Sequence, residues 1–406
     1  MMTESKQNLV PEIRFSGFTN AWERQKLGEV YKERKERGID SLPILSVSIH
    51  HGVSDEELDG NTLGKEVRRS DDKSLYKRVY AGDLVINMMR AWQGAIGVVK
   101  SDGMVSPAYI TAIPNSHVYP PFMDFYLRRD ESILQMDNLS QGVTDFRKRL
   151  YWDSFIDITC HLPSLLEQER ISDFFHILNN TITLHKRKLD ELVTLKNGFL
   201  QQMFPVADEV VPRVRFAGFT GNWEERRLGE MLTERNEQFE ESEDYPLMSF
   251  VGNVGVVPKG EQYDRSFLVK GDNKKYKRTE LNDFIYSSNN LETGSIGFNR
   301  TGKAVISPVY SIFYSNNDSE SLFVGLLSKR KDFINKMIHY RQGVMYGQWR
   351  IHERDFLKII VLTPTFSEQN RIIDFFKNLD EQIAAQTAKL EQLRQLKAAY
   401  LQRMFI

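Results

Sequence analysis

The sequence predicts an α+β protein that is built twice along one chain, with two α/β domains separated by two long helices that form an antiparallel coiled coil. Three observations predict this fold class. The chain repeats itself after 201 residues, since Glu167 and Glu368 open the matching segments EQERISDFF and EQNRIIDFF. Each repeat ends in a helical heptad pattern, and each begins with short strand patterns. A pseudo-twofold axis would relate the two halves.

The repeat is strongest at the two ends of each half. Residues 11–30 match residues 212–231 at 11 of 20 positions, and residues 163–204 match residues 364–405 at 19 of 42 positions. The segments between these ends differ more freely. The repeat therefore predicts four parts, which are a first domain over 1–162, a first long helix over 163–205, a second domain over 206–363 and a second long helix over 364–406.

The predicted long helices carry apolar residues at alternating spacings of four and three, which is typical of a coiled-coil seam. SLLE at 164–167 and TFSE at 365–368 fit the capping box that starts a helix. Two similar seams in one chain favour pairing between them over packing of each helix on its own domain. About 37 residues at ~1.5 Å each would span roughly 55 Å. The seam positions are Leu178, Ile182, Leu189, Leu192, Phe199 and Met203, then Leu379, Ile383, Leu390, Leu393, Tyr400 and Met404, with polar His185 and Gln386 among them.

Each domain shows patterns of short strands and of helices. The predicted strands cover 78–88, 94–100, 283–288, 294–300 and 303–314, and the predicted helices cover 122–139 and 321–339.

The composition indicates a globular protein of the cytoplasm. Apolar residues make up 41% and charged residues 27% of the chain, as in folded domains with buried cores. No apolar run reaches the ~18 residues of a membrane span, and the first residues lack a signal-peptide pattern. The single cysteine, Cys160, excludes a disulfide framework. Because 54 basic and 55 acidic residues give a net charge of −1, binding of nucleic acid would need a local basic face.

Motifs for catalysis are weak. GFNRTGKA at 297–304 imitates a phosphate loop, but Ala304 stands where Ser or Thr would hold magnesium, and a strand pattern follows instead of a helix. YPPF at 119–122 resembles the tetrapeptide of amino-methyltransferases, but Tyr119 replaces the residue that engages the target amine. The histidines show no metal-ligand spacing. We expect no catalytic residue, metal or cofactor in this chain.

Basic, amide and aromatic residues gather at matched places in both halves. Lys and Arg suit contacts with phosphates, and Arg, Gln and Asn suit contacts with base edges. A charged surface loop explains any one cluster, but recurrence at matched positions favours a DNA-binding face. The matched segments are 65–78 with 270–278, 88–94 with 287–294, and 139–152 with 340–353. The candidate DNA contacts are Arg68, Arg69, Lys73, Lys77, Arg78, Arg90, Trp92, Gln93, Gln141, Thr144, Arg147 and Lys148 in the first half, and Lys274, Lys275, Lys277, Arg278, Ser288, Asn289, Asn290, Arg341, Gln342, Tyr346, Gln348 and Arg350 in the second.

Over essentially its whole length the chain resembles the specificity subunits of type I restriction–modification systems. The resemblance rests on the openings RFSGF…W…LGE and RFAGF…W…LGE, on the GDL and NDF strands, and on P-x-x-x-E-Q-x-R-I-x-D-F-F before a Leu-rich helix, twice. It implies two target-recognition domains that each read one part of a split double-stranded DNA site, held apart by the coiled coil. It also implies partners that carry the chemistry. These are two modification subunits that bind S-adenosylmethionine and methylate adenine, and restriction subunits that use ATP and magnesium.

Two other interpretations stay open, which are a coiled-coil scaffold that binds proteins instead of DNA and a nucleotide-hydrolysing enzyme that uses Lys303. The two E-Q-x-R-I-x-D-F-F segments would offer equivalent docking faces for partner subunits, unless their rings pack each helix against its own domain. The rings concerned are Phe174, Phe175, Phe375 and Phe376.

Overall fold

The computed structural model divides into two compact units that share both long helices. Unit 1 joins Met1–Lys186 to Ala388–Ile406, and unit 2 comprises Arg187–Thr387. Each unit therefore holds one domain, the first turns of one long helix and the last turns of the other. The structure describes residues 9–49, 52–54, 74–142, 148–206, 209–252, 254–258, 275–289, 291, 295–344 and 348–406.

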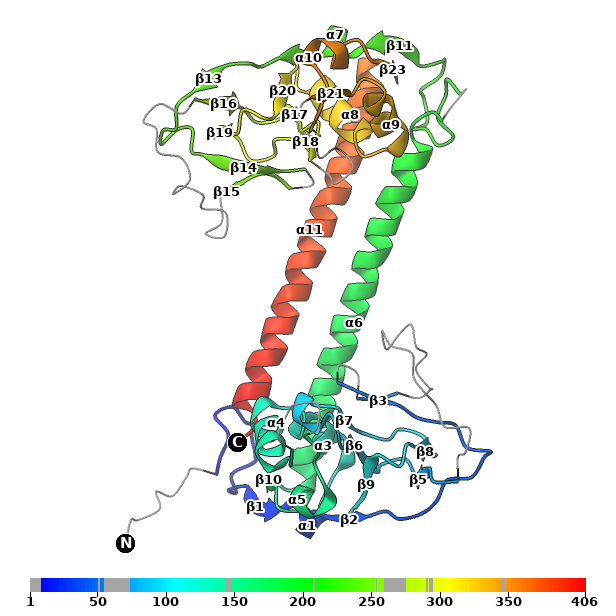
Figure 1. Cartoon of the computed structure of the whole chain (residues 1–406), viewed down its shortest axis with the longest axis vertical. Helices are drawn as coiled ribbons and strands as arrows, with labels where there is room; N and C mark the ends of the chain where they lie inside the picture. Colours follow the sequence, from blue (N-terminus) through cyan, green and yellow to red (C-terminus); the bar gives the residue numbers. More distant parts are fainter. Residues whose placement is uncertain are drawn as a thin grey trace. The chain divides into compact units, whose positions relative to one another are not determined.

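The two long helices are α6 (Leu165–Gln202) and α11 (Phe366–Arg403), each of 38 residues. In unit 1 the ring of Phe174, near the start of α6, lies 5.0 Å from the ring of Tyr400, near the end of α11. In unit 2 Phe199 and Phe375 lie 5.0 Å apart in the reverse sense. The helices are thus antiparallel within each unit, and all the predicted seam positions are buried or half-buried. This confirms the predicted pairing of helix with helix (Figure 1).

The glutamates of the expected capping boxes form ion pairs with arginines. Both carboxylate oxygens of Glu167 accept hydrogen bonds from Arg14 at 2.6 Å, and Glu368 accepts two from Arg215 at 2.7 Å. Each glutamate is 1% exposed. The pairs explain why the R-F-x-G-F opening and the E-Q-x-R segment repeat together, because one holds the other in place.

Unit 1 is built on a four-stranded antiparallel sheet in the order β2-β9-β6-β7. Its strands are β1 (Glu23–Lys26), β2 (Tyr31–Glu33), β3 (Val47–Ser48), β4 (Gly52–Val53), β5 (Lys77–Val79), β6 (Leu84–Asn87), β7 (Ile96–Val98), β8 (Gly103–Val105), β9 (Tyr109–Pro114) and β10 (Thr159–Leu162). Its short helices are α1 (Leu27–Val30), the 3₁₀ turn η1 (Ala91–Gln93), α3 (Pro120–Tyr126), α4 (Asp130–Leu139) and α5 (Trp152–Phe155). Strand β10 pairs with β1 and leads directly into α6.

Unit 2 repeats this topology with the sheet order β12-β20-β17-β18. Its strands are β11 (Glu224–Arg227), β12 (Thr233–Glu234), β13 (Gln238–Phe239), β14 (Met248–Val251), β15 (Gly255–Pro258), β16 (Tyr276–Thr279), β17 (Phe284–Tyr286), β18 (Ile296–Phe298), β19 (Ala304–Ile306), β20 (Ser311–Tyr314), β21 (Gln342–Val344), β22 (Gln348–Arg350) and β23 (Ile360–Thr363). Its short helices are α7 (Leu228–Met231), α8 (Ser319–Leu327), α9 (Lys331–Ile338) and α10 (Glu353–Phe356). The α+β class with two repeated domains is confirmed.

Two segments predicted as single helices are each split into two. The chain leaves the helix at Arg129, between α3 and α4, and at Arg330, between α8 and α9. Arg129 donates to the carbonyl of Ile406, and Arg330 donates to the carbonyls of Leu200 and Pro205. At each corner the arginine therefore binds the end of a long helix, and this tertiary contact decides where the short helices break.

The end of one long helix completes the core of the domain built from the other half of the sequence. In unit 1 the ring of Phe405, just after α11, lies 5.4 Å from Phe122 and 6.2 Å from Trp22. In unit 2 Phe204, just after α6, lies 5.6 Å from Phe323. All these rings are at most 4% exposed. Neither domain would keep its full core without the helix end that the other half supplies.

Candidate nucleic-acid interface

In unit 2 the structure joins two of the segments predicted to contact DNA. The side-chain oxygen of Asn289 accepts a hydrogen bond from the backbone N–H of Trp349 at 2.8 Å, and the hydroxyl of Ser288 accepts one from Ile351 at 3.0 Å. The loop after β17 is thereby fixed to the ribbon of β21 and β22. Segments about 60 residues apart in sequence form one polar surface, called here the loop–ribbon face of unit 2.

Unit 1 builds the same face from its own residues. The backbone N–H of Leu150 donates to the carbonyl of Met88 at 2.9 Å, which ties the loop after β6 to the segment around residue 149. Gln141 and Arg149 exchange two backbone hydrogen bonds at 2.9 Å and so start a ribbon like that of unit 2. We call this surface the loop–ribbon face of unit 1.

The loops of the two faces carry different side chains, while the ribbons share a glutamine (Gln141, Gln342) and an arginine (Arg149, Arg350) at equivalent positions. Of the predicted contacts in unit 1, Arg90, Gln93 and Gln141 are exposed and Trp92 is half-buried. The Trp92 indole N–H donates to the carbonyl of Met89, and the ammonium of Lys148 lies 5.6 Å from the Trp92 ring. Exposed amide and guanidinium groups of this kind can donate to and accept from base edges.

Unit 2 presents amide, hydroxyl and guanidinium groups and an indole on its face. Asn289, Gln342 and Arg350 are exposed, and Ser288 and Arg341 are half-buried. Trp349 is 50% exposed although it is a large apolar ring. The different side chains, on equivalent backbones, give the two faces different hydrogen-bonding capacities.

The lysines of the two Tyr-Lys-Arg segments turn inward. The ammonium of Lys77 donates to the carbonyl of Tyr109 at 2.7 Å, and that of Lys277 donates to the carbonyl of Tyr310 at 3.0 Å. Burial lowers the pKa of Lys77 below its ordinary value. Lys77 and Lys277, which were predicted to contact phosphates, thus bind backbone carbonyls at the central sheet.

Other predicted cations are engaged by carboxylates of their own unit. Arg278 donates to Glu280 at 2.6 Å and to Glu237 at 2.9 Å. Lys148 donates to Asp137 at 2.6 Å. Arg78 lies over the Tyr80 ring, 4.6 Å from its centroid. These contacts leave Lys275, which is exposed, as the described lysine of its segment best placed to meet solvent.

Several predicted contacts lie outside the described residues, and for these the prediction stands as it was made. They are Arg68, Arg69, Lys73, Thr144, Arg147, Lys274, Asn290 and Tyr346, and the side chain of Gln348 belongs with them.

Two residues of the faces were missed by the sequence prediction. Arg149 is exposed beside Gln141, and Trp349 is exposed beside Asn289. The signal was present for Trp349, because a large aromatic ring flanked by Gln348 and Arg350 in a two-stranded ribbon can face solvent by alternation. For Arg149 the signal was the repeat, because this residue stands 201 positions before Arg350, which the sequence prediction included.

The phenylalanines expected at docking faces lie in or against the hydrophobic cores. Phe175 is fully buried and Phe376 is 1% exposed. Phe174 packs edge-on against Phe15, and Phe375 packs against Phe216. The structure therefore places these rings between each long helix and its own domain, as the alternative interpretation expected, and Phe175 and Phe376 present no exposed surface to a partner.

In each unit a buried ion pair fixes the start of the strand that leads into the loop. Arg34 donates to Asp83 at 2.6 and 3.0 Å, and Arg235 donates to Asp283 at 2.8 and 3.2 Å. Burial raises the pKa of Asp283, while the hydrogen bond from Arg235 acts in the opposite direction. The aspartates stand one residue before β6 and β17, whose far ends carry the loops, which accounts for the repeated GDL and NDF motifs.

The turn before each aspartate also repeats, with a left-handed backbone. Gly82 has φ +95° and its counterpart Asn282 has φ +68°. Glycine and asparagine are the residues that adopt this conformation at least cost. The turn splits the strand predicted over 78–88 into β5 and β6.

Neither a phosphate loop nor a metal cluster is found in the described part of the chain. Strand β19 follows the GFNRTGKA segment, and Lys303 lies 5.6 Å from the Tyr245 ring. Within the described ranges, no three His, Cys, Asp or Glu side chains gather as metal ligands would. The described helices also include none that combines the length and the apolar character needed to cross a bilayer.

The duplicated domains, the paired long helices and the two loop–ribbon faces define a class of proteins that present two similar recognition domains on one helical framework. Residues 220–395 match the family model described as type I restriction modification DNA specificity domain. No curated protein sequence matches the chain.

Solved structures share this fold over nearly the full chain. The S subunit of a type I restriction–modification system from M. genitalium is 12% identical with a TM-score of 0.60, and the match covers 98% of this chain and 99% of that one. The HsdS subunit from Thermoanaerobacter tengcongensis is 18% identical with a TM-score of 0.50, covering 100% and 99%. A structure from work on complex assembly and conformational transition of the type I R-M system is 16% identical with a TM-score of 0.51, covering 96% and 98%.

Residues 220–395 are thus similar in sequence to a type I restriction modification DNA specificity domain, and the whole chain shares its fold with S subunits of such systems.

Proposed function

We propose that this chain is the DNA-recognition subunit of a type I restriction–modification system and that it reads a split, asymmetric DNA site, with one part of the site read by each domain. The observation that carries the proposal is the pair of loop–ribbon faces, which have matching backbones and different side chains in their loops. Arg90 and Gln93 stand after β6, where Ser288 and Asn289 stand after β17. Two readers with different hydrogen-bonding groups would recognise different bases, so the whole site would lack twofold symmetry.

We also propose that the subunit scaffolds two modification subunits and the restriction subunits, and that these partners carry S-adenosylmethionine, ATP and magnesium. Exposed apolar side chains on α6 support a docking role. Leu166, Ile177 and Leu184 are 66%, 67% and 66% exposed, and their spacings of 11 and 7 residues put them on one side of the helix. The catalytic steps would then belong to the partners.

Exchange of the second domain tests the proposal. Residues 206–362 would be replaced by the corresponding domain of a relative with a different target, and the methylated site would be mapped in cells that express the modification subunit. We expect one half of the site to change and the other half to remain. The matched control exchanges residues 1–162 and should change only the other half. A change of both halves in either chimera would refute independent reading.

A further inference from the structure

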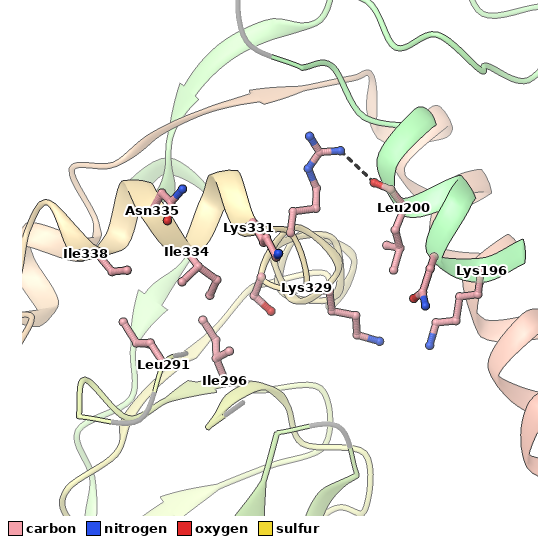
Figure 2. Close-up of a pocket in the computed structure, with 12 residues that line it drawn as sticks. Lys196, Leu200, Leu291, Ile296, Lys329, Lys331, Ile334, Asn335 and Ile338 are labelled. Atoms are coloured by element: carbon pink, nitrogen blue, oxygen red, sulfur yellow. Dashed lines mark hydrogen bonds between the residues drawn. The ribbon is translucent and has the colours of Figure 1, made fainter. Parts of the chain in front are cut away.

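A pocket of about 560 Å³ lies in unit 2 between α6, α9 and the loop that follows β17. Figure 2 shows its two sides. Lys196 of α6 and Lys329 extend toward each other on one side, while Ile334 and Ile338 of α9 face Leu291 and Ile296 on the other.

The described lining of this pocket is cationic. Lys196, Lys329, Arg330 and Lys331 line it together with neutral residues, and no acidic residue is found among its described lining residues. The guanidinium of Arg330 is already engaged by the carbonyls of Leu200 and Pro205 and by Asp332. The lysines are therefore the groups able to receive a ligand.

Just outside the pocket, one carboxylate serves three cations. Asp380 of α11 accepts from Lys196, lies 3.0 Å from the Arg300 guanidinium and lies 3.9 Å from the Lys329 ammonium. Lys196 and Lys329 each keep only 16% of their side chains exposed. Three positive charges and one negative charge leave an excess of two positive charges in a half-buried place, which is an arrangement that attracts an anion.

The pocket also borders the loop–ribbon face of unit 2. Leu291 lies in the loop that includes Ser288 and Asn289, and Ile296 is the first residue of β18, which follows this loop. An anion held at the lysines would lie beside the bases that the loop is proposed to read. Phosphates of the DNA backbone are the anions found there, and phosphate contacts fix the register in which base contacts are made.

We propose that this pocket binds a backbone phosphate of the DNA through Lys329 and Lys331, next to the half-site read by unit 2. The inference rests on the proposed function, because it takes DNA as the ligand. Burial, with the nearby Lys196 and Arg300, lowers the pKa of Lys329 to about 7. A bound phosphate would hold the proton on this lysine and add a second negative charge beside it, besides the carboxylate of Asp380.

Unit 1 differs from unit 2 at one of the two lysines proposed to bind phosphate. The positions equivalent to Lys331 and Ile338, 201 residues earlier, are Asp130 and Asp137. Two carboxylates at these places would repel a phosphate. The counterparts of Lys329 and Lys196 are Arg128 and Lys397, which lie near each other, so the two units share these cations and differ at the position of Lys331.

The test measures how DNA affinity depends on salt. The full chain, purified with its modification subunit, would be titrated with a short duplex of mixed sequence over a series of salt concentrations. Each lost phosphate contact should make the slope of log Kobs against log salt less steep by about 0.9. We expect this change for Lys329→Gln and for Lys331→Gln, and about twice the change for the double variant. Lys331 is exposed, so its replacement leaves the fold intact.

The matched control is Lys336→Gln, an exposed lysine on the same helix that does not line the pocket, and its slope should equal that of the parent. Salt-dependent binding by the parent with unchanged slopes in the pocket variants would overturn the phosphate site and leave the proposed function standing. Loss of the modification subunit from the variants, with unchanged slopes, would assign the pocket to an acidic side chain of that partner. Absence of DNA binding by the parent complex would overturn the proposed function, and this inference with it.

Discussion

At the scale of single residues, two kinds of charged site can be distinguished. Some are buried ion pairs that stabilise the fold, and one is a lysine that we propose binds DNA. Glu167 and Glu368 are buried and bind one arginine each through two oxygens, and the pairs recur in both units. Breaking a buried pair of this kind typically costs ~3–5 kcal/mol. Lys329 is different, because it is buried among other cations and shares a single carboxylate with them.

The position of Lys329 predicts a pH dependence of stability. The charged groups around it are Lys196 of α6, Arg300 after β18 and Asp380 of α11. Its folded pKa of about 7 lies below the ordinary 10.5, so the unfolded chain holds this proton more tightly. The resulting destabilisation is full below about pH 7, decreases as the pH rises, and vanishes above about pH 10.5.

The variant Lys329→Met should therefore melt at a higher temperature than the parent at and below neutral pH. The difference should shrink steadily toward alkaline pH, as followed by thermal unfolding at a series of pH values. Lys336→Met is the control, because this lysine is exposed and its replacement should give a difference that does not vary with pH. A difference for Lys329→Met that stayed constant with pH would show that the lysine is not held at a lowered pKa.

At the scale of elements, the sequence was most informative where the repeat and the periodicity agreed. The heptad pattern located the seam of α6 and α11, because the apolar character and the spacing of seam residues can both be read from a short stretch of sequence. The break between α3 and α4 could not be predicted, because neither Pro nor Gly marks it. It depends on Arg129 reaching the carbonyl of Ile406, a contact 277 residues away in sequence.

The candidate site was predictable only in part, for a similar reason. The recurrence of clusters identified the loops and ribbons that the structure brings together. It could not show that Lys77 and Lys277 turn inward. When the neighbours of a strand residue are also charged, the local sequence does not tell which face of the sheet its side chain occupies. Composition gave the positive charges, and only the packing shows which of them carboxylates and carbonyls already engage.

The long helices predict the spacer between the two half-sites. Inserting seven residues into α6 after Lys188 and seven into α11 after Lys389, at equivalent exposed positions, keeps the heptad register of both seams. The insertions add ~10.5 Å of helix, which is about three base pairs at ~3.4 Å per pair. We expect unchanged half-sites and a spacer longer by about three base pairs, measured by mapping the methylated site.

Insertion into α6 alone is the control for this experiment. It leaves one helix longer than its partner, so the seam loses register and recognition should fail. A double insertion that altered the half-sites and kept the spacer would show that the helices do not set the spacing.

At the scale of the whole molecule, we propose that one chain reads two different DNA sequences. The duplicated framework supplies two equivalent supports, through the Arg34–Asp83 and Arg235–Asp283 pairs. The divergent loop–ribbon faces supply two different surfaces. A symmetric dimer would present the same face twice and would favour a palindromic site. Duplication within one chain removes that restriction, because each face can change without the other.

The most direct test of this claim is a map of methylated adenines across the genome of a host that lacks adenine methylation. The host would express this chain together with its modification subunit. The account predicts a single motif made of two unlike parts separated by a spacer of fixed length. A continuous motif, a palindrome, or an intact cofactor-bound complex that methylates no adenine would contradict it.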